Sequence, residues 1–497
     1  MLSRMKRLPA LLLLLVCLGS SLTGASLHPY NPEQPFDSQA ALAATDFSTP
    51  LSGDAKVYAG QCHISVLVMG SLGPLYSWFG HVAFLVEEPD GRSIVYDYGV
   101  FDTSKPGFFL DFLKGRMLYN VWRTDGTWRL RSEEESGRSI IRYDLPLSDS
   151  QKLGMIRFLE ENTQSGNDQY LYHFYRDNCS TRIRDIVDSA TGGAFKDWAE
   201  TQPIAPTSYR SAANRKLSRN PALCWILNFL QGPSVDTRLS LWDAMFLPDT
   251  LGGAIGDFFG IQGEVVQEGT IANKDGSPFL ALVILPLAIG LCLSSMLILV
   301  REKPLWHWMM GTVLSVLGLL SCLLLYGMCL TDLDMTWGNT TILYLNPLLF
   351  VAMRSIHKGE EERARWIIKG LSVPALAVLA LSLCNPYGSN FGTELLVLPI
   401  YLTAWVRGGR LTRLQSPRQE TVSPHACCPL ESGSAGILPS GSGMGHNGRQ
   451  SRLQSRSVGQ TGPGLPPACR FWPVPSGAAR SAGRFWRMRR PPLPRKS

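Results

Sequence analysis

The chain has 497 residues, which is too long for one ordinary domain and enough for two or three. Its apolar share of 45% is ordinary, but long apolar runs lie between residues 277 and 405, which excludes a purely soluble and a fully disordered protein. From Arg410 onward, 14 Lys or Arg stand against two Glu, so this tail accounts for +12 and the rest of the chain carries −5. The basic character belongs to the tail, and we expect no nucleic-acid partner.

Residues 1–26 have the composition of an export signal. Arg4, Lys6 and Arg7 precede the apolar run Leu8–Leu18, and small residues follow it. This pattern is typical of a secretory signal peptide, and an uncleaved N-terminal anchor is the alternative. In either case the residues that follow are exported.

Residues 27–275 mix alternating and helical hydrophobic patterns and predict a soluble α+β domain. One helix is expected to begin at Ser148 or Ser150 and to end near Glu161, and another to run from Cys179 to about Ser189. Strands are expected at His63–Met69, His81–Val86, Ser93–Tyr98, Met117–Trp122 and Ser139–Tyr143.

Residues 276–410 predict an all-α transmembrane domain of about five helices, and residues 411–497 predict a disordered basic tail. Alternate loops are rich in Lys and Arg, whereas Asp332–Asn339 and Asn385–Thr393 contain neither. By the positive-inside rule the basic loops are cytoplasmic, which places residues 27–275 on the periplasmic side. The expected spans are Phe279–Val300, Trp308–Leu330, Thr340–Met353, Ile367–Leu383 and Glu394–Trp405. The third and fifth are short, and they could be tilted, re-entrant or extended by flanking residues.

The exported domain holds three cysteines, Cys62, Cys179 and Cys224, so at least one thiol is free. Their spacing does not suggest zinc, and we expect no cofactor. Asn178 is a candidate N-cap for a helix that opens with Cys179. The helix dipole lowers the pKa of such a thiol, and the amides that follow could donate to an oxyanion. A buried structural cysteine is the alternative.

A nucleophilic thiol needs a base, and His81 is the first candidate. It begins a predicted strand directly after Gly80, in a segment that starts at Ser77. A glycine there lets another backbone approach, and a histidine at the rim of a strand can act on a neighbouring thiol. His173 is a weaker candidate because it belongs to the aromatic approach to Cys179.

Asp97, on the return strand of the predicted hairpin, is the candidate that orients the imidazole of His81. The register decides this role. A two-residue turn at Asp90-Gly91 places Asp97 and His81 on opposite faces, whereas a longer loop or a bulge places them on one face. Tyr98 is the substitute if the turn is tight.

The order of a histidine on a strand, a polar residue on the next strand and Asn-Cys at a helix start resembles the permuted papain-like, NlpC-related thiol enzymes, including the lecithin:retinol acyltransferase family. That resemblance implies a base role for His81 and a nucleophile role for Cys179. Asp97 falls where those relatives carry a second histidine, which is a departure from the pattern.

A second resemblance covers about Val57 to Trp405. Five ordered motifs are similar to the Lnb-type bacterial lipoprotein N-acyltransferases: SWFGHVAFLVEE, IVYDYGVFD, YHFYRDNCSTRIRD, LWDAMFLPDTL and ILYLNPL. The resemblance implies a multi-pass protein of the bacterial cytoplasmic membrane with a periplasmic catalytic domain. It also implies that an acyl chain moves from a membrane phospholipid, through a cysteine thioester, to the N-terminal amine of a diacylglyceryl-cysteine lipoprotein.

Given such substrates, further residues become candidates for lipid contact. Arg176 and Arg182 flank the thiol and could meet a phosphate, although ordinary ion pairs are the alternative. The apolar segment Phe246–Ile261 could lie at the lipid headgroups or belong to the core. Two other functions remain open: an envelope papain-like peptidase or amidase, in which water accepts the acyl group, and a membrane-tethered scaffold in which Cys179 is only structural.

Overall fold

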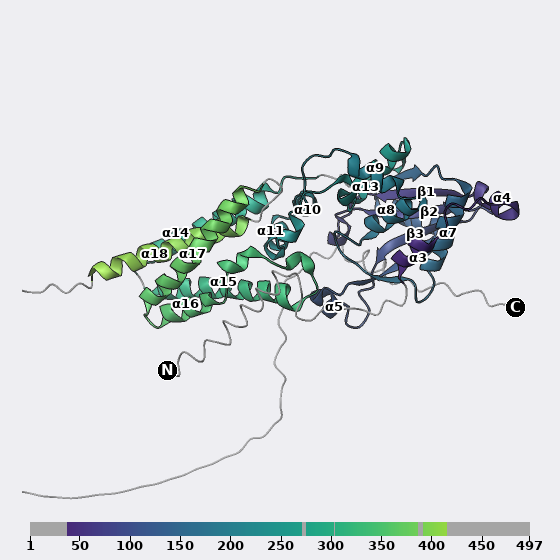
Figure 1. Ribbon diagram of the computed structural model, residues 1–497. Helices are drawn as coiled ribbons and strands as arrows, with labels where there is room; N and C mark the ends of the chain where they lie inside the picture. The colour runs from purple at the N-terminus through teal and green to yellow at the C-terminus, as the bar shows by residue number, and fades with distance from the viewer. Residues whose placement is uncertain (1–36, 271–274, 303, 386–390, 415–497) are drawn as a thin grey trace, which may run out of the picture. The chain divides into compact units, whose positions relative to one another are not determined.

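The computed structural model describes residues 37–270, 275–302, 304–385 and 391–414 (Figure 1). The predicted signal segment at residues 1–26 and the predicted basic tail from residue 415 onward lie outside the described residues. Within them, a sheet-containing domain precedes a helical region, so the predicted order of an α+β domain and a helical domain is confirmed.

A seven-stranded antiparallel sheet, in the order β6-β4-β3-β2-β1-β5-β7, forms the centre of the first domain. Five strands lie within a few residues of their predicted positions, whereas the short β6 and β7 were not predicted. The strands are β1 (His63–Met69), β2 (His81–Glu87), β3 (Ser93–Val100), β4 (Leu118–Asp125), β5 (Ile140–Asp144), β6 (Gln169–Leu171) and β7 (Glu264–Gln267).

The two faces of the sheet carry different layers. Alternate side chains, such as Phe84 and Tyr96, point into the main core, where helices α7 (Asp149–Asn162), α8 (Cys179–Ala190) and α13 (Pro248–Phe259) pack. The opposite face has a smaller core that is covered by α6 (Gly126–Ser136). The helices predicted near Ser148 and at Cys179 are both confirmed.

The remaining helices of this domain were not predicted individually. The segment Phe246–Ile261 contains α13, and Phe246, Leu251 and Ile255 are buried. Of the two alternatives left open for this segment, the core position therefore holds, because its apolar side chains face the protein. The helices are α3 (Ser38–Ala44), α4 (Gly53–Gln61), α5 (Phe108–Lys114), α9 (Ala194–Thr201), α10 (Tyr209–Leu217), α11 (Pro221–Leu230) and α12 (Leu241–Ala244).

Three helices in the described part of the chain are long and apolar enough to cross a membrane: Leu280–Leu299, Leu305–Leu330 and Glu361–Leu383. The first consists of a π-helical turn followed by α14 (Leu285–Leu299), and the others are α15 and α17. Helix α18 (Gly392–Leu414) has a shorter apolar part, Gly392–Thr403.

The expected span Thr340–Met353 is not one helix. It contains the 3-10 turn Thr340–Leu343 and then the ten-residue helix α16 (Leu348–His357). Pro347 separates the two because proline disfavours a helical conformation in the residue before it. The side chain of Asn346 accepts a hydrogen bond from the N–H of Leu348, the first residue of the second helix, at 3.0 Å.

Candidate active site

Cys179 is the first residue of α8, and Asn178 is its N-cap as predicted. The Asn178 side chain accepts hydrogen bonds from the N–H groups of Ser180 and Thr181, both at 2.9 Å. These two amides therefore have a partner, and the expectation that the amides after the thiol serve as oxyanion donors is wrong for both of them. The thiol still lies at the positive end of the helix dipole.

The start of β2 positions His81. Gly80 has a φ of +84°, and a Cβ atom there would lie 2.9 Å from the carbonyl oxygen of Met69. Only glycine combines this backbone conformation with such a close approach. The reasoning that Gly80 allows a second backbone to come near His81 is confirmed, and the approaching backbone is the end of β1.

The imidazole of His81 and the thiol of Cys179 lie close enough for each to shift the pKa of the other. Burial alone would raise the pKa of the thiol, but the interactions with His81 and with the N–H of Val82 outweigh burial and lower it. Burial would likewise lower the pKa of His81, yet the thiolate and Asp97 raise it to about 9. Each of the two groups therefore favours the charged form of the other.

Asp97 lies on the same face of the sheet as His81. The hairpin has a three-residue loop, because Glu88 and Arg92 still form a backbone hydrogen bond and Ala83 is the partner of Asp97. His81 Nε2 and Asp97 Oδ1 are 2.9 Å apart, which leaves Nδ1 as the ring nitrogen for the sulfur. The Asp97 side chain is only 4% exposed.

Tyr98, the substitute for Asp97, lies on the other face of β3. Its hydroxyl donates to Asn162 Oδ1 at 2.9 Å, inside the main core. The tight-turn register that would have brought Tyr98 to His81 is therefore wrong. Proline in the loop and a left-handed Gly91, with φ at +84°, favour the longer hairpin loop instead.

A series of buried ion pairs, which was not predicted from the sequence, holds Asp97 in place. Arg129 of α6 binds both oxygens of Asp97, with Nε at 2.9 Å and Nη2 at 3.2 Å. Arg129 also pairs with Glu133, and Glu133 pairs with Arg138. Although burial opposes ionisation, the charge of Arg129 and the hydrogen bond from His81 hold the pKa of Asp97 far below its usual range. The only local signal was the four-residue spacing of Arg129 and Glu133.

Helix α8 approaches β3 at Gly99, which has a φ of +83°. A Cβ atom there would lie 3.3 Å from the Tyr172 ring and 3.7 Å from the Cys179 Cβ. The ladder to β4 shifts register between Tyr98 and Val100, so the strand bulges at this point. Glycine thus permits the close contact that places the thiol beside the strand.

Ser77 and Arg182, two other predicted site residues, stabilise the fold and do not contact the thiol in the described contacts. Ser77 donates to the carbonyl of Pro74 at 2.7 Å and stabilises a turn. Arg182 forms a two-point pair with Asp177 and stacks on the ring of Tyr170. Both side chains have partners within the protein and are mostly buried, so the ion-pair alternative holds for Arg182.

His173 does not contact the thiol in the described contacts. Its Nδ1 accepts from the N–H groups of Tyr175 and Arg176, at 3.1 and 3.0 Å, so Nε2 carries the proton that is donated to Asp334 at 2.8 Å. Arg176 also pairs with Asp334, at 2.7 Å. Both predicted residues therefore connect the thiol segment to the turn after α15.

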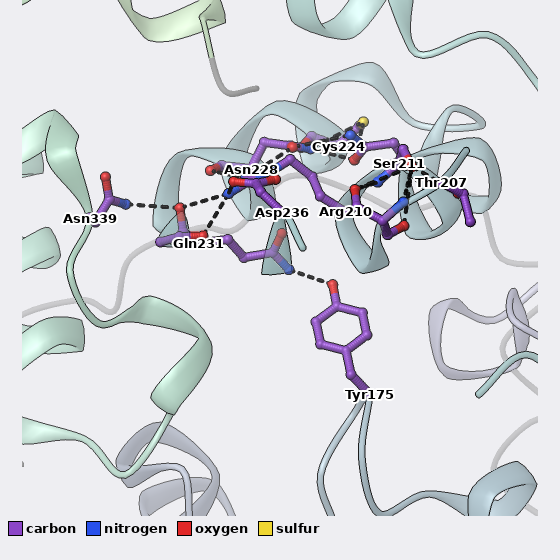
Figure 2. Close-up of polar contacts among 12 residues, drawn as sticks. Tyr175, Thr207, Arg210, Ser211, Cys224, Asn228, Gln231, Asp236 and Asn339 are labelled. Atoms are coloured by element: carbon purple, nitrogen blue, oxygen red, sulfur yellow. Dashed lines mark hydrogen bonds and ion pairs between the residues drawn. The ribbon is translucent and has the colours of Figure 1, made fainter. Parts of the chain in front are cut away.

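Figure 2 shows a second connection between these regions. Gln231 Nε2 donates to the hydroxyl of Tyr175 at 2.7 Å. The backbone carbonyl of Gln231 accepts from Asn339 Nδ2 at 3.2 Å. The guanidinium of Arg210, which is 1% exposed, pairs with Asp236 and donates to the carbonyls of Asn228 and Gln231. Buried hydrogen bonds thus fix the thiol loop relative to the segment between α15 and α16.

The three cysteines of the soluble domain are free, and the described residues contain no cluster of His, Cys, Asp or Glu that could hold a metal ion. Cys62 and Cys224 are buried, and burial raises the pKa of both thiols, that of Cys224 to about 11. Cys179 is the one thiol of the three whose pKa is lowered.

Comparison with known proteins supports the family resemblance that was inferred from the five motifs. No curated protein and no solved structure matches the chain. A family model described as the Lnb N-terminal periplasmic domain matches residues 52–215, a range that includes His81, Asp97 and Cys179. Together with the three apolar helices behind it, the match indicates a membrane protein with a periplasmic domain of the Lnb type, and connects the chain with lipoprotein biogenesis.

Proposed function

We propose that this protein is a lipoprotein N-acyltransferase of the bacterial cytoplasmic membrane. In this proposal, residues 27–275 form a permuted papain-like catalytic domain and residues 276–410 a multi-pass membrane domain. The observation that carries it is the position of Cys179 at the start of α8 against β3, where it and His81 shift one another's pKa, together with the bond between Asp97 and His81 Nε2. Thiol, base and orienting carboxylate are the groups that acyl transfer through a thioester needs.

In the first half-reaction, the Cys179 thiolate attacks an ester carbonyl of a membrane phospholipid. The C–S bond forms and the ester C–O bond breaks. The imidazolium of His81 donates its proton to the departing oxygen, so the products are an acyl-thioester and a lysophospholipid. The raised pKa of His81 keeps this proton available at neutral pH.

In the second half-reaction, the neutral imidazole of His81 accepts a proton from the α-amine of a diacylglyceryl-cysteine lipoprotein as the amine attacks the thioester. The C–N bond forms, the C–S bond breaks, and the thiolate–imidazolium pair is restored. Asp97, held by Arg129, keeps Nε2 engaged through both steps. Both substrates are anchored in lipid, so a membrane-anchored enzyme meets them at a high effective concentration.

The proposal is tested with purified full-length protein in proteoliposomes that contain phospholipid labelled in its acyl chain. Incubation should give a labelled, hydroxylamine-sensitive Cys179 peptide, and addition of a diacylated lipoprotein should move the label to that lipoprotein as a third chain. Cys179→Ala should abolish both products. Cys224→Ala is the matched control, because this thiol is also free but is buried away from His81.

The acceptor separates the proposal from its rivals. Release of the label as free fatty acid, with no triacylated lipoprotein, would indicate a hydrolase. Hydrolysis of envelope peptides without any lipid-derived thioester would indicate a peptidase. A Cys179→Ala protein that keeps full transferase activity would overturn the assignment of the nucleophile.

A further inference from the structure

Helix α5 exposes an apolar surface that the protein does not cover. Phe109, Leu110, Phe112 and Leu113 are 67, 57, 42 and 57% exposed, and no residue of this helix is buried. Four large apolar side chains in one short helix are unusual on a surface that faces only water.

The place of α5 in the chain's contacts points to what covers it. The carbonyl of Lys114, its last residue, accepts from the N–H of Asp332 at 2.9 Å, two residues beyond the end of the candidate span α15. The carbonyl of Leu113 accepts from the hydroxyl of Tyr326, in the last turns of α15, at 3.1 Å. Arg116 pairs with Asp332 at 3.0 Å. The exposed helix is thus fixed at the level where a candidate membrane helix ends.

Aromatic side chains lead from α5 towards the thiol. Phe108 stacks on Phe101, with ring centroids 5.8 Å apart, and Phe101 lies 5.1 Å from the ring of Tyr119. Tyr119 stacks on Tyr172 at 4.5 Å. Tyr172 adjoins Gly99, the position at which β3 meets Cys179. The apolar surface of α5 is therefore continuous with the aromatic residues beside the nucleophile.

We propose that α5 inserts its exposed face into the outer leaflet of the bilayer, and that the acyl chain of the donor phospholipid reaches Cys179 along the aromatic residues from Phe108 to Tyr172. The occupant of the surface is lipid, because the helix lies at the end of a candidate span and its exposed side chains are aliphatic and aromatic. The route of the acyl chain to Cys179 rests on the proposed acyl transfer. The insertion of α5 into the bilayer does not.

The lipid contact is tested by photocrosslinking in proteoliposomes of full-length protein. Leu110→p-benzoylphenylalanine should crosslink to phospholipid. Val57→p-benzoylphenylalanine is the matched control, because Val57 is 61% exposed on α4, which Figure 1 shows at the end of the domain remote from α14–α18. Crosslinking at Leu110 at least about tenfold above Val57 is expected, since burying one apolar side chain contributes about 1.5–3 kcal/mol. Equal yields at the two positions would overturn the proposal.

The route of the acyl chain begins at the exposed face of α5, and this entrance is tested with two donors. Phe109→Asp should slow thioester formation from bilayer phospholipid about tenfold and leave the rate with a dispersed short-chain phospholipid within about twofold. Val57→Asp should change neither rate. Equal slowing with both donors would show a structural defect and refute the route. If the unaltered protein forms no thioester with either donor, the proposed function fails, while the crosslinking result still decides whether α5 contacts lipid.

Discussion

Asp97→Asn is the sharpest test of the charge arrangement at the candidate active site. The substitution keeps the size of the side chain and removes its charge. In the structure the Asp97 carboxylate is 4% exposed and lies between His81 Nε2, at 2.9 Å, and Arg129 Nε, at 2.9 Å. Its loss leaves the imidazolium without its counter-ion and leaves Arg129 with Glu133 as its remaining carboxylate in the described contacts.

Two magnitudes follow. A hydrogen bond to a charged group contributes about 1.5–3 kcal/mol, which corresponds to about one to two pKa units. The pKa of His81, about 9 in the native protein, should fall by that amount, and the pKa of the Cys179 thiol should rise because its cation is less stable. Removing one partner of a buried ion pair costs about 3–5 kcal/mol, so the variant should also melt at a lower temperature.

The assay is alkylation of Cys179 by iodoacetamide between about pH 5 and pH 10, followed by mass spectrometry of the Cys179 peptide. Since only the thiolate reacts, the acid limb of the rate profile should move upward by about one to two pH units in Asp97→Asn. Asp90→Asn is the control, because Asp90 is exposed and pairs with Arg92 in the hairpin loop. An acid limb that does not move would refute the thiolate–imidazolium arrangement.

Stability should depend on pH in a defined direction. The folded pKa of Asp97 lies far below that of the unfolded chain, so its contribution is complete above about pH 4 and is lost as the pH falls further. The difference in melting temperature between the native protein and Asp97→Asn should therefore be largest near neutral pH and should shrink below about pH 4. A difference that grows in acid would contradict the lowered pKa.

Three further outcomes are expected. Gly99→Ala should lower the melting temperature more than Gly192→Ala, because both have a positive φ, worth about 1–2 kcal/mol, but only at Gly99 would the new Cβ meet other atoms; equal effects would count against the close approach. Arg210→Met should destabilise the protein by about 3 kcal/mol in thermal unfolding, since it leaves the carboxylate of Asp236, which is only 14% exposed, without its Arg210 partner; an unchanged melting curve would contradict this. At pH 8 iodoacetamide should label Cys179 and spare Cys224, whose raised pKa of about 11 keeps it protonated; similar labelling of both would be inconsistent with their environments.

The elements that local sequence patterns describe were predictable. The strand His63–Met69 and the helix that starts after Asn178 are where alternation and capping place them, because these signals depend on neighbours in the chain. The position of the segment Phe246–Ile261 was left open between lipid and core, since apolar content alone does not tell whether a helix faces lipid or the sheet, and the core alternative holds. The break at Pro347 was missed because the apolar run continues across it.

At the candidate site, sequence order sufficed to pair Cys179 with His81, but the register of Asp97 depended on a loop length that short motifs leave open. The role of Arg129 could not be foreseen, because it depends on which face of the sheet α6 covers. The face of the sheet that a helix covers is decided by how whole layers pack against each other. No local sequence pattern at Arg129 predicts it.

The side chain of Asn178 has a consequence for how two substrates would reach Cys179 in the proposed reaction. Besides accepting from two amides of α8, it donates to the carbonyls of Phe174 and Phe246, at 2.9 and 3.0 Å. Moving the start of α8, and with it the backbone of Cys179, would break these four hydrogen bonds. The backbone that carries the thiol is therefore fixed, unlike the flexible arm of a carrier protein, and in the proposed reaction the donor and the acceptor would have to bind in turn at this one position.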